Sequence, residues 1–370
     1  MPNKINLFSY LISCLFVLSL GSANNAAYAN EENQATEHHS KKFNAGKLIL
    51  EHVSDEHGWH IVTIGQGTEH EKHIVLPLPI IIYSRTKGVQ VFSSSKFVNH
   101  ETHQNQSYDG YELKEQKIIS EDQSEVFYDL SITKNVFALF ISLLLMLWVF
   151  ISVANTYKKN PGKAPKGLQS FVEPLVIFIR DEVAKPSIGP KYKIYLPILL
   201  TIFFFIFFNN LLGLIPILPG GANVTGNIAV TLVLALTVFA ITLFSSKKDF
   251  WIHIINTPGV PWWLKFPIPL MPIVELLGLI SKPVVLCLRL FANITAGHII
   301  VLAFFSLIFI FGEINAGIGF GVSIVSVAFS IFMNFLELLV AFLQAYVFTL
   351  LASLYFGSAL EEHHHEEAQH

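Results

Sequence analysis

The sequence predicts an all-α membrane protein with five membrane-crossing helices after removal of a signal peptide, together with a small outer domain of short β-strands. First, only 14% of the 370 residues are charged and the mean hydropathy is +0.52, which is too apolar for an ordinary soluble protein. Second, several uncharged apolar runs are long enough to cross a bilayer as helices. Third, polar residues and histidines gather between residues 30 and 130, which sets that stretch apart as a domain.

Residues 1–29 have the pattern of a secretory signal peptide. Lys4 gives a positive start, residues 7–20 form an apolar core, and the Ala-Tyr-Ala sequence at residues 27–29 fits a cleavage site. An uncleaved anchor helix is the alternative interpretation. A cleaved signal predicts that the mature chain begins outside the cytoplasm.

Residues 30–130 are polar and rich in histidine, and alternating runs such as residues 88–92 are typical of short strands. The histidine spacings match no standard zinc pattern. Cys14 lies in the leader and Cys287 in an apolar run, so the two cysteines provide no disulfide framework. We therefore expect a solvated β-containing domain, and we predict no metal and no cofactor.

Residues 131–166 hold the first membrane helix of the mature chain, over residues 136–153, and the linker that follows it. The linker contains four lysines, Lys158, Lys159, Lys163 and Lys166. Because positively charged loops stay in the cytoplasm, residues 30–130 are predicted to lie outside.

Residues 168–184, at the start of a channel domain expected over residues 167–356, mix apolar and charged side chains at helical spacing. Two interpretations remain open for this stretch. It is either a surface helix lying in the membrane interface or an ordinary helix beside a loop. Pro186 and Pro190 are expected to end it.

Residues 194–214 and 228–244 are predicted to form a membrane hairpin whose turn faces outward. Asn227 stands where it can cap the second helix. Asn209 and Asn210 are expected to serve the end of the first helix, with hydration of a path into the membrane as the alternative.

Two apolar segments, residues 271–310 and 318–356, are too long for ordinary membrane helices. Each would extend roughly 60 Å as a helix, whereas the hydrocarbon core is about 30 Å thick. A break into two spans would need a polar turn, and neither segment has one near its middle. We therefore predict two steeply tilted helices joined by a turn at residues 312–321. The tail, residues 357–370, is acidic, rich in histidine and expected in the cytoplasm.

Four ionisable residues of these long segments have no simple explanation, namely Glu275, Arg289, His298 and Glu337. A charged residue at the bilayer centre costs roughly 2.5–3.5 kcal/mol on insertion scales, and such residues usually mark paths for ions or protons. A snorkelling Arg289 is the simpler alternative. Because Arg289 is not near a helix end, we favour a functional role for it.

Helical geometry separates these residues into groups. Glu275 lies about 40° from Arg289 around the axis and roughly 21 Å along it, while Asn293 is one turn beyond Arg289. His298 lies about 180° around from Arg289 and roughly 13 Å further toward the outside. On the last helix, Glu337 and Gln344 differ by about 20° around the axis and roughly 10 Å along it, and Asn334 sits one turn from Glu337.

The run from Arg289 to His298, Arg-Leu-Phe-Ala-Asn-Ile-Thr-Ala-Gly-His, and the later Phe-Leu-Gln-Ala-Tyr-Val-Phe at residues 342–348 carry a family resemblance. They resemble subunit a of the proton-translocating ATP synthase, in a bacterial form with an N-terminal extracytoplasmic extension. The resemblance covers roughly residues 168–356. Ala292 stands where glycine is common in the family, and His298 and Glu337 stand in the reverse order to some members.

The resemblance implies a stator subunit with two proton half-channels. Arg289 would be the essential charge barrier facing a rotor carboxylate, and His298 with Glu337 would pass protons on the outer side. Gln344 would orient Arg289, and Glu275 is a candidate for the inner half-channel. Asn293 and Asn334 would flank the path.

The resemblance also implies the partners: a rotor c-ring, peripheral-stalk subunit b and, through the complex, a catalytic head. It implies a multi-pass protein of the bacterial inner membrane with its N-terminal domain outside and its C-terminus in the cytoplasm. No Walker motif occurs, so the chain is not expected to be an enzyme by itself. Lipid is an expected partner and nucleic acid is not.

Two other function classes predict different sequence features. A self-contained proton-coupled secondary transporter would show repeats between residues 136–244 and 271–356, and none is evident. A membrane enzyme using a metal would need clustered histidines or carboxylates, and only one histidine lies in the membrane segments. Stoichiometric purification with a ring of small hairpin proteins would favour the stator over the transporter.

Overall fold

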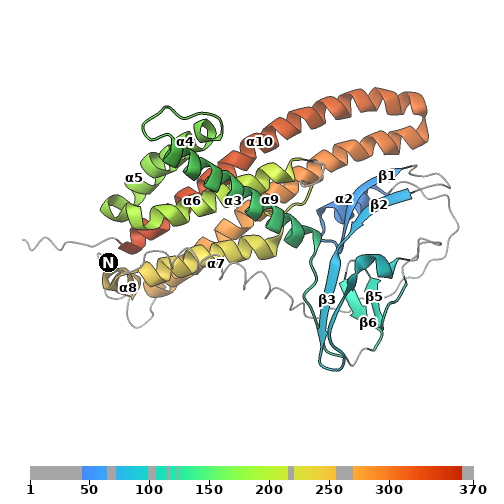
Figure 1. The fold of residues 1–370 in the computed structure, drawn as a ribbon, viewed down its shortest axis with the longest axis horizontal. Coiled ribbons are helices and arrows are strands. Elements are labelled where there is room, and N and C mark those ends of the chain that lie inside the picture. The colour runs from blue at the N-terminus through green and yellow to red at the C-terminus, as the bar shows by residue number, and fades with distance from the viewer. Residues whose placement is uncertain are drawn as a thin grey trace, which may run out of the picture.

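A computed structural model of the protein describes residues 44–64, 72–98, 106–114, 117–122, 125–215, 221–255 and 270–360. The predicted signal peptide and the end of the tail lie outside these residues. The described chain forms an elongated bundle of helices with a small β-containing domain against one end of it (Figure 1). This arrangement confirms the predicted fold class.

The N-terminal domain, called the outer domain after its predicted side of the membrane, consists, in its described part, of one α-helix, a 3₁₀ helix at Ser94–Phe97 and three small antiparallel sheets. Strand β3 is central, because Ile82 pairs with Gln90 of β4 on one side and with Asp129 of β7 on the other. The elements are α2 (Ala45–Val53), β1 (Gly58–Ile64), β2 (Lys72–Pro77), β3 (Pro79–Ser84), β4 (Gly88–Ser93), β5 (Tyr111–Lys114), β6 (Lys117–Ser120) and β7 (Phe127–Asp129).

The core of the outer domain follows from the alternation along its strands. Ile80 and Ile82 of β3 point inward and are fully buried, together with Phe97 and Tyr111. Between β3 and β4 the chain turns tightly, and Gly88 takes a positive φ of 72°, which a side chain would disfavour. Residues 88–92, which the alternating pattern predicted to be a strand, lie in β4.

Helix α3 (Lys134–Lys159) leads from the outer domain along the bundle. Thr133 caps it by accepting a hydrogen bond from the backbone N–H of Val136. The helix ends at the lysines predicted to lie in the cytoplasm. It is longer at both ends than the apolar run of residues 136–153, because its polar ends extend past the hydrocarbon segment.

The segment from α4 to α6 corrects one prediction. Pro186 does not end the helix, whereas α5 ends at Ile188, because Gly189 takes a positive φ of 70° directly before Pro190. Pro186 lies in the first turn of α5, where a missing N–H costs no hydrogen bond, and Pro190 lies at the start of a 3₁₀ turn. In chain order, the segment contains α4 (Leu168–Phe178), a π-helical turn (Ile179–Ala184), α5 (Lys185–Ile188), a 3₁₀ turn (Gly189–Lys191) and α6 (Tyr192–Gly213).

Helix α6 and helix α7 (Ile228–Ser245) form the predicted hairpin, and α8 (Lys248–Ile255) follows. Asn227 caps α7 as predicted, since its side-chain oxygen accepts from the backbone N–H of Ala229 at 2.9 Å.

The last two helices are α9 (Leu270–Ile314) and α10 (Ala316–Leu360), each of 45 residues. Only Asn315 separates them, so their turn is shorter than the sequence predicted. Both helices are unbroken, and α9 accommodates Pro283 in its interior. Their joined ends extend beyond the other helices in Figure 1. At 1.5 Å per residue each is roughly 68 Å long, which confirms the prediction of two long helices.

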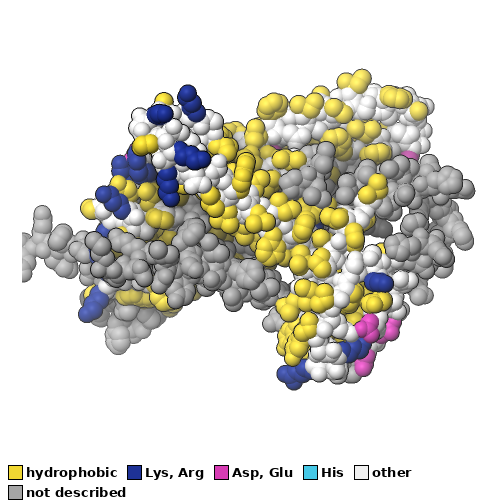
Figure 2. All heavy atoms as spheres, viewed as in Figure 1, with side chains coloured by type: hydrophobic (Ala, Val, Ile, Leu, Met, Phe, Trp, Pro, Cys, Tyr) yellow, Lys and Arg dark blue, Asp and Glu magenta, His cyan; other side chains and the backbone are white. Residues whose placement is uncertain are grey.

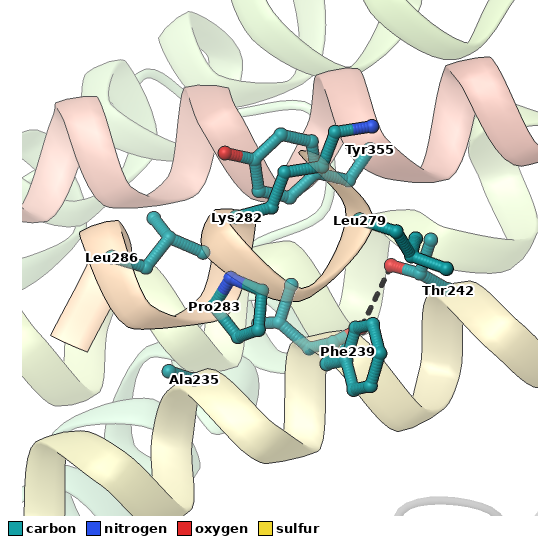
Figure 3. A pocket seen from close by; sticks show the side chains of 9 residues that line it. Ala235, Phe239, Thr242, Leu279, Lys282, Pro283, Leu286 and Tyr355 are labelled. Atoms are coloured by element: carbon teal, nitrogen blue, oxygen red, sulfur yellow. Dashed lines mark hydrogen bonds between the residues drawn. The ribbon is translucent and has the colours of Figure 1, made fainter. Parts of the chain in front are cut away.

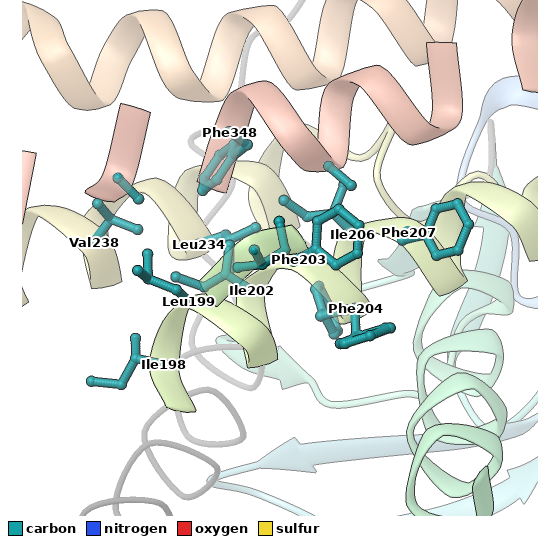
Figure 4. Close-up of a cluster of buried hydrophobic side chains, with 14 of the residues drawn as sticks. Ile198, Leu199, Ile202, Phe203, Phe204, Ile206, Phe207, Leu234, Val238 and Phe348 are labelled. Atoms are coloured by element: carbon teal, nitrogen blue, oxygen red, sulfur yellow. The ribbon is translucent and has the colours of Figure 1, made fainter. Parts of the chain in front are cut away.

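Helix α6 lies at the centre of the bundle. Its side chains Leu199, Phe203 and Ile206 are fully buried, and Val238 of α7 and Phe348 of α10 pack into the same cluster (Figure 4). Within the described residues, five helical segments are long and apolar enough to cross a membrane. The other membrane segments therefore pack around the buried α6.

Candidate functional site

Arg289 lies on an exposed face of α9. Its neighbours Leu286 and Leu290 are buried in the bundle, whereas Arg289 and Leu288 face outward. Among the described residues, no carboxylate forms an ion pair with Arg289. A guanidinium on an apolar face has a high energetic cost in a membrane. The arrangement leaves this cation directed away from its own chain.

Because α9 and α10 pack antiparallel, the contacts on either side of Arg289 show which part of α10 lies beside it. Toward the end of the pair near the N-terminal domain, Gly297 lies against Glu337, and toward the opposite end the Lys282 ammonium lies 5.4 Å from the Tyr355 ring centroid. Arg289 therefore falls level with the turn of α10 that carries the half-buried Gln344.

Exposed apolar side chains form a stripe along both long helices, and Val285 and Leu288 belong to it near Arg289. On α10 it includes Phe335, which is 69% exposed, and Leu339, which is 54% exposed. Asn293 of α9 and Asn334 of α10 are exposed polar residues of the same hairpin. The described chain leaves this stripe uncovered, so it faces either lipid or a partner.

The outer part of the hairpin brings together Gly297, His298 and Glu337. A Cβ atom built on Gly297 would lie only 2.5 Å from Glu337 Oε1, so the glycine makes room for the carboxyl group. A Cβ built on Gly213, at the end of α6, would lie 3.7 Å from His298 Nε2. Both ionisable side chains thus lie at the level where α6 ends. Glu337 Oε1 is buried without a hydrogen-bond partner among the described residues.

Two further polar residues lie at this level; Thr225 was not predicted as part of the site, and Asn210 was assigned to it only as the alternative interpretation. Asn210 Nδ2 donates to the Ala341 carbonyl at 3.1 Å, and Thr225 Oγ1 donates to Asn210 Oδ1 at 2.6 Å. Asn210 is 3% exposed, so it braces α6 against α10 and does not serve the helix end. The signal in the sequence is a pair of adjacent asparagines in an apolar run, a pattern that also fits a helix terminus.

At the inner part of the hairpin, a pocket lies between α7, α9 and α10 (Figure 3). Lys282, Pro283 and Leu286 of α9 line it, with Thr242 of α7 and Tyr355 of α10. Glu275 lies two turns before Lys282 and is half-buried. The structure does not bring Glu275 close to Arg289, because they are separated by roughly 21 Å along one helix.

Charged residues are unevenly distributed over the surface. Figure 2 shows Lys and Arg side chains gathered around α4 and α5, at the end of the bundle opposite the outer domain. In this view the Asp and Glu side chains are seen mainly on the outer domain. Within the described residues, no group of three or more His, Cys, Asp and Glu side chains is placed to hold a metal ion.

Comparisons with known proteins agree with this architecture. A family model described as a domain of unknown function (DUF8433) matches residues 48–137. The chain is 42% identical over 250 residues to an ATP synthase subunit a of Chloroherpeton thalassium, covering 66% of this chain and 71% of the relative. It is 45% identical over 250 residues to an ATP synthase subunit a 2 of Prosthecochloris aestuarii, covering 66% and 73%. The family model described as ATP synthase A chain matches residues 136–357, and the chain therefore belongs to that family.

Proposed function

We propose that the chain is the stator subunit of a proton-translocating ATP synthase and that it couples proton flow to rotation of a ring of rotor subunits. The observation that carries the proposal is the outward-facing Arg289 on an apolar stripe of two 45-residue helices. No carboxylate of the described chain pairs with it. A carboxylate on a partner helix would complete this site.

Arg289 acts as a fixed charge in this scheme. A guanidinium stays protonated at physiological pH, so it attracts a rotor carboxylate only while that carboxylate is ionised. The attraction is about 4 kcal/mol at 4 Å for an effective dielectric constant of 20, and it falls below about 2 kcal/mol at 10 Å. The interaction is therefore confined to one rotor site at a time. The same charge opposes direct passage of protons between the two half-channels.

The outer half-channel would be formed by His298 and Glu337, which lie at one level of the hairpin, with Asn334 beside them. A carboxyl group and an imidazole are groups that exchange protons when they are placed in a polar cleft. Asn293 and Gln344 would flank Arg289. They would hold it toward the rotor.

The inner half-channel would begin at Glu275 and pass the pocket beside Lys282 and Tyr355. A Lys ammonium near an aromatic ring is held by a cation–π attraction, which keeps Lys282 in place on this route. Protons released from the rotor on this side would reach the cytoplasm.

We place the protein in a bacterial inner membrane with the outer domain outside and the C-terminus in the cytoplasm. The lysines at the end of α3 and the cations around α4 and α5 support this orientation. The surface that these cations form is suited to binding peripheral-stalk subunit b. The catalytic head would lie beyond that surface. The chain would not itself hydrolyse ATP.

Two substitutions of Arg289 test the proposal in inverted membrane vesicles. Arg289→Ala should abolish ATP-driven proton uptake and allow an imposed proton gradient to leak. Arg289→Lys should also abolish coupled synthesis, because an ammonium lacks the planar fork and loses its charge more readily on desolvation. Lys193→Gln, at an exposed cation in the first turn of α6, is the control and should pump normally.

ATP-driven uptake by Arg289→Ala, in complexes shown to be assembled, would refute the role of Arg289. A second measurement on the same membranes would distinguish the stator from a secondary transporter. The stator should purify in fixed stoichiometry with a ring of small hairpin proteins, whereas a transporter would purify without one.

A further inference from the structure

The three-stranded sheet of the outer domain is apolar on both of its faces. One face carries Ile80 and Ile82 of β3 and forms the buried core of the domain. The other face carries Ile81 and Tyr83, because successive side chains of a strand point to opposite faces. An antiparallel sheet that covers a core normally presents polar side chains on its other face. The second face of this sheet is therefore not the usual surface between a protein and water.

Strand pairing places side chains from all three strands on this second face. Tyr83 lies opposite Val89 of β4 and opposite Tyr128 of β7, and Ile81 lies opposite Val91 of β4. Val89 is 66% exposed and Val91 is 65% exposed. We call these five residues the sheet patch. A contiguous exposed apolar patch of this kind marks a contact with a protein or a membrane, whereas single exposed apolar residues need no explanation.

The neighbouring sheet of β5 and β6 shows the ordinary pattern. It covers the same core from the other side with Tyr111 and Ile118, so its outward face points away from the sheet patch. That outward face carries Glu112, Lys114 and Lys117, and the first two form an ion pair at 2.9 Å. Charged side chains are what a surface in water normally presents. The two sheets of one small domain are thus suited to different surroundings.

The sheet patch is held in a defined position beside the start of α3. Thr133 Oγ1 donates to Asp55 Oδ2 at 2.9 Å, and the backbone N–H of Asn135 donates to Asp55 Oδ1 at 3.0 Å. Trp59 of β1 packs edge-on against Phe137 of α3, with ring centroids 5.9 Å apart. A carboxylate at a helix N-terminus and a buried aromatic contact both stabilise such an attachment. The outer domain is therefore anchored on the first turn of a membrane helix.

The sheet patch continues the lipid-facing surface of α3. Only residues 130–133 separate β7 from α3, and four residues span at most about 14 Å. Leu130, the first of them, is exposed, as are Leu144 and Trp148 on α3, a helix long and apolar enough to cross a membrane. Figure 2 shows apolar side chains over β3 and over α3 on the same face of the molecule. The apolar run of α3 begins at residue 136, so the sheet patch lies beside the surface of the membrane.

The other side chains around the sheet patch suit the surface of a bilayer. The rings of Tyr83 and Tyr128 stack with centroids 6.4 Å apart, and both side chains are partly exposed. Tyrosine is enriched at membrane interfaces, because its ring is apolar and its hydroxyl group is polar. Arg85 is exposed in the turn that follows β3. In Figure 2 the Asp and Glu side chains of the domain lie away from the apolar side chains over β3, so they do not oppose contact with phosphate headgroups.

We propose that the sheet patch rests on the lipid headgroups of the leaflet at which α3 begins, with Tyr83 and Tyr128 in the interface and Arg85 near the phosphates. The occupant is the bilayer surface, because the patch is continuous with the lipid-facing side of α3. This contact gives the domain matched as one of unknown function a second attachment to the membrane. The proposal goes beyond proton coupling and does not depend on the role of Arg289.

Fluorescence quenching in the intact complex tests this contact in vesicles of phosphatidylethanolamine and phosphatidylglycerol. Val89→Cys provides a site for an environment-sensitive label on the sheet patch. Ile119→Cys is the matched control, since Ile119 is an exposed aliphatic residue on the outward face of the other sheet. Trp148→Cys on α3 serves as the reference for contact with lipid. The unsubstituted chain, in which Cys287 is buried, gives the background of labelling.

The label at Val89 should be quenched by lipids that carry a spin label near the headgroup. Acrylamide, a neutral quencher dissolved in water, should quench it several-fold less than it quenches the label at Ile119. Val91→Glu beside the labelled Val89 should raise quenching by acrylamide, because a carboxylate disfavours the interface. Val91→Thr, which keeps the shape without a charge, should change it less.

Three results would overturn the proposal. Equal quenching by acrylamide at Val89 and Ile119 would show that the sheet patch faces water. Protection of the Val89 label from both acrylamide and the spin-labelled lipid would show that a protein covers the patch, and loss of that protection on dilution of the complex in lipid would identify a second copy. Quenching at Val89 that does not respond to Val91→Glu would show that the apolar face does not hold the domain on the bilayer.

Discussion

Gly297 of α9 lies directly against the carboxyl group of Glu337 on α10, with space for a hydrogen atom but not for a methyl group. A Cβ built on Gly297 would be 2.5 Å from Oε1 and 3.1 Å from both Cδ and Cγ. The contact is therefore with three atoms of the side chain and not only with its mobile end. Gly297 determines where the Glu337 carboxyl group can lie, and it directly precedes His298.

Gly297→Ala is expected to displace the Glu337 carboxyl group and slow proton flow, while the complex assembles normally. Helix stability should not fall, because alanine favours a helix by about 1 kcal/mol over glycine. The control is Gly278→Ala on the same helix, where a new Cβ meets nothing within 4 Å. Proton uptake in inverted vesicles checks both. Equal rates for the two variants would show that the Gly297 contact does not set the position of Glu337.

His298 and Glu337 are predicted to work as a proton-handling pair. Either single substitution, His298→Leu or Glu337→Leu, should slow translocation, because each removes one of two exchanging groups. Exchanging the residues, with His298→Glu and Glu337→His together, should restore part of the rate. The measurement is passive proton flow through membranes stripped of the catalytic head. If proton flow through the exchange variant is no faster than through the slower single variant, the two residues do not work as a pair.

The sequence predicted those features that depend on local pattern and length. The two long helices followed from apolar runs without a polar break, and Asn227 was recognised as a cap from its position before an apolar run. Arg289, His298 and Glu337 stood out because charges are costly in apolar segments. Their roles remain predictions.

The features that the sequence did not predict depend on tertiary contacts. The bonds from Asp55 to Asn135 and Asn227 join residues 80 and 172 positions apart, and no local pattern marks them. Asn210 was misjudged because its partner, Ala341, is 131 positions away. Pro186 was expected to end a helix, but a proline in a first turn fits a new helix equally well.

Asn210 is expected to stabilise the packing of α6 on α10. Asn210→Leu removes the donor to the Ala341 carbonyl and leaves the Thr225 hydroxyl without its acceptor. Loss of buried hydrogen-bond partners should destabilise the chain by about 1–3 kcal/mol. Thr225→Val combined with Asn210→Leu should cost less than the sum of the single changes, since one interaction is shared. Thermal unfolding of the complex in detergent measures this, and additive losses would contradict the coupling.

Glu125 should make the stability of the outer domain dependent on pH in the acid range. Its carboxylate accepts hydrogen bonds from Ser84, Thr86 and Ser120, and these bonds lower its pKa from the usual 4.5 to about 2. A carboxyl group with a lowered pKa stabilises the fold fully above its unfolded pKa, and the stabilisation is lost as the pH falls through the folded pKa. The loss should therefore occur between about pH 4.5 and pH 2.

Glu125→Gln should reduce this acid dependence. The variant is less stable than wild type at neutral pH, because a neutral amide is a weaker acceptor than a carboxylate. Its stability should fall less between pH 4.5 and pH 2 than that of wild type. Asp129 of the same domain, whose pKa is also lowered, contributes a loss that both proteins share. Hydrogen exchange of the β3 and β6 amides in the intact chain, measured across this range, reports the difference. Parallel pH profiles for the two proteins would show that Glu125 does not carry the acid sensitivity of the domain.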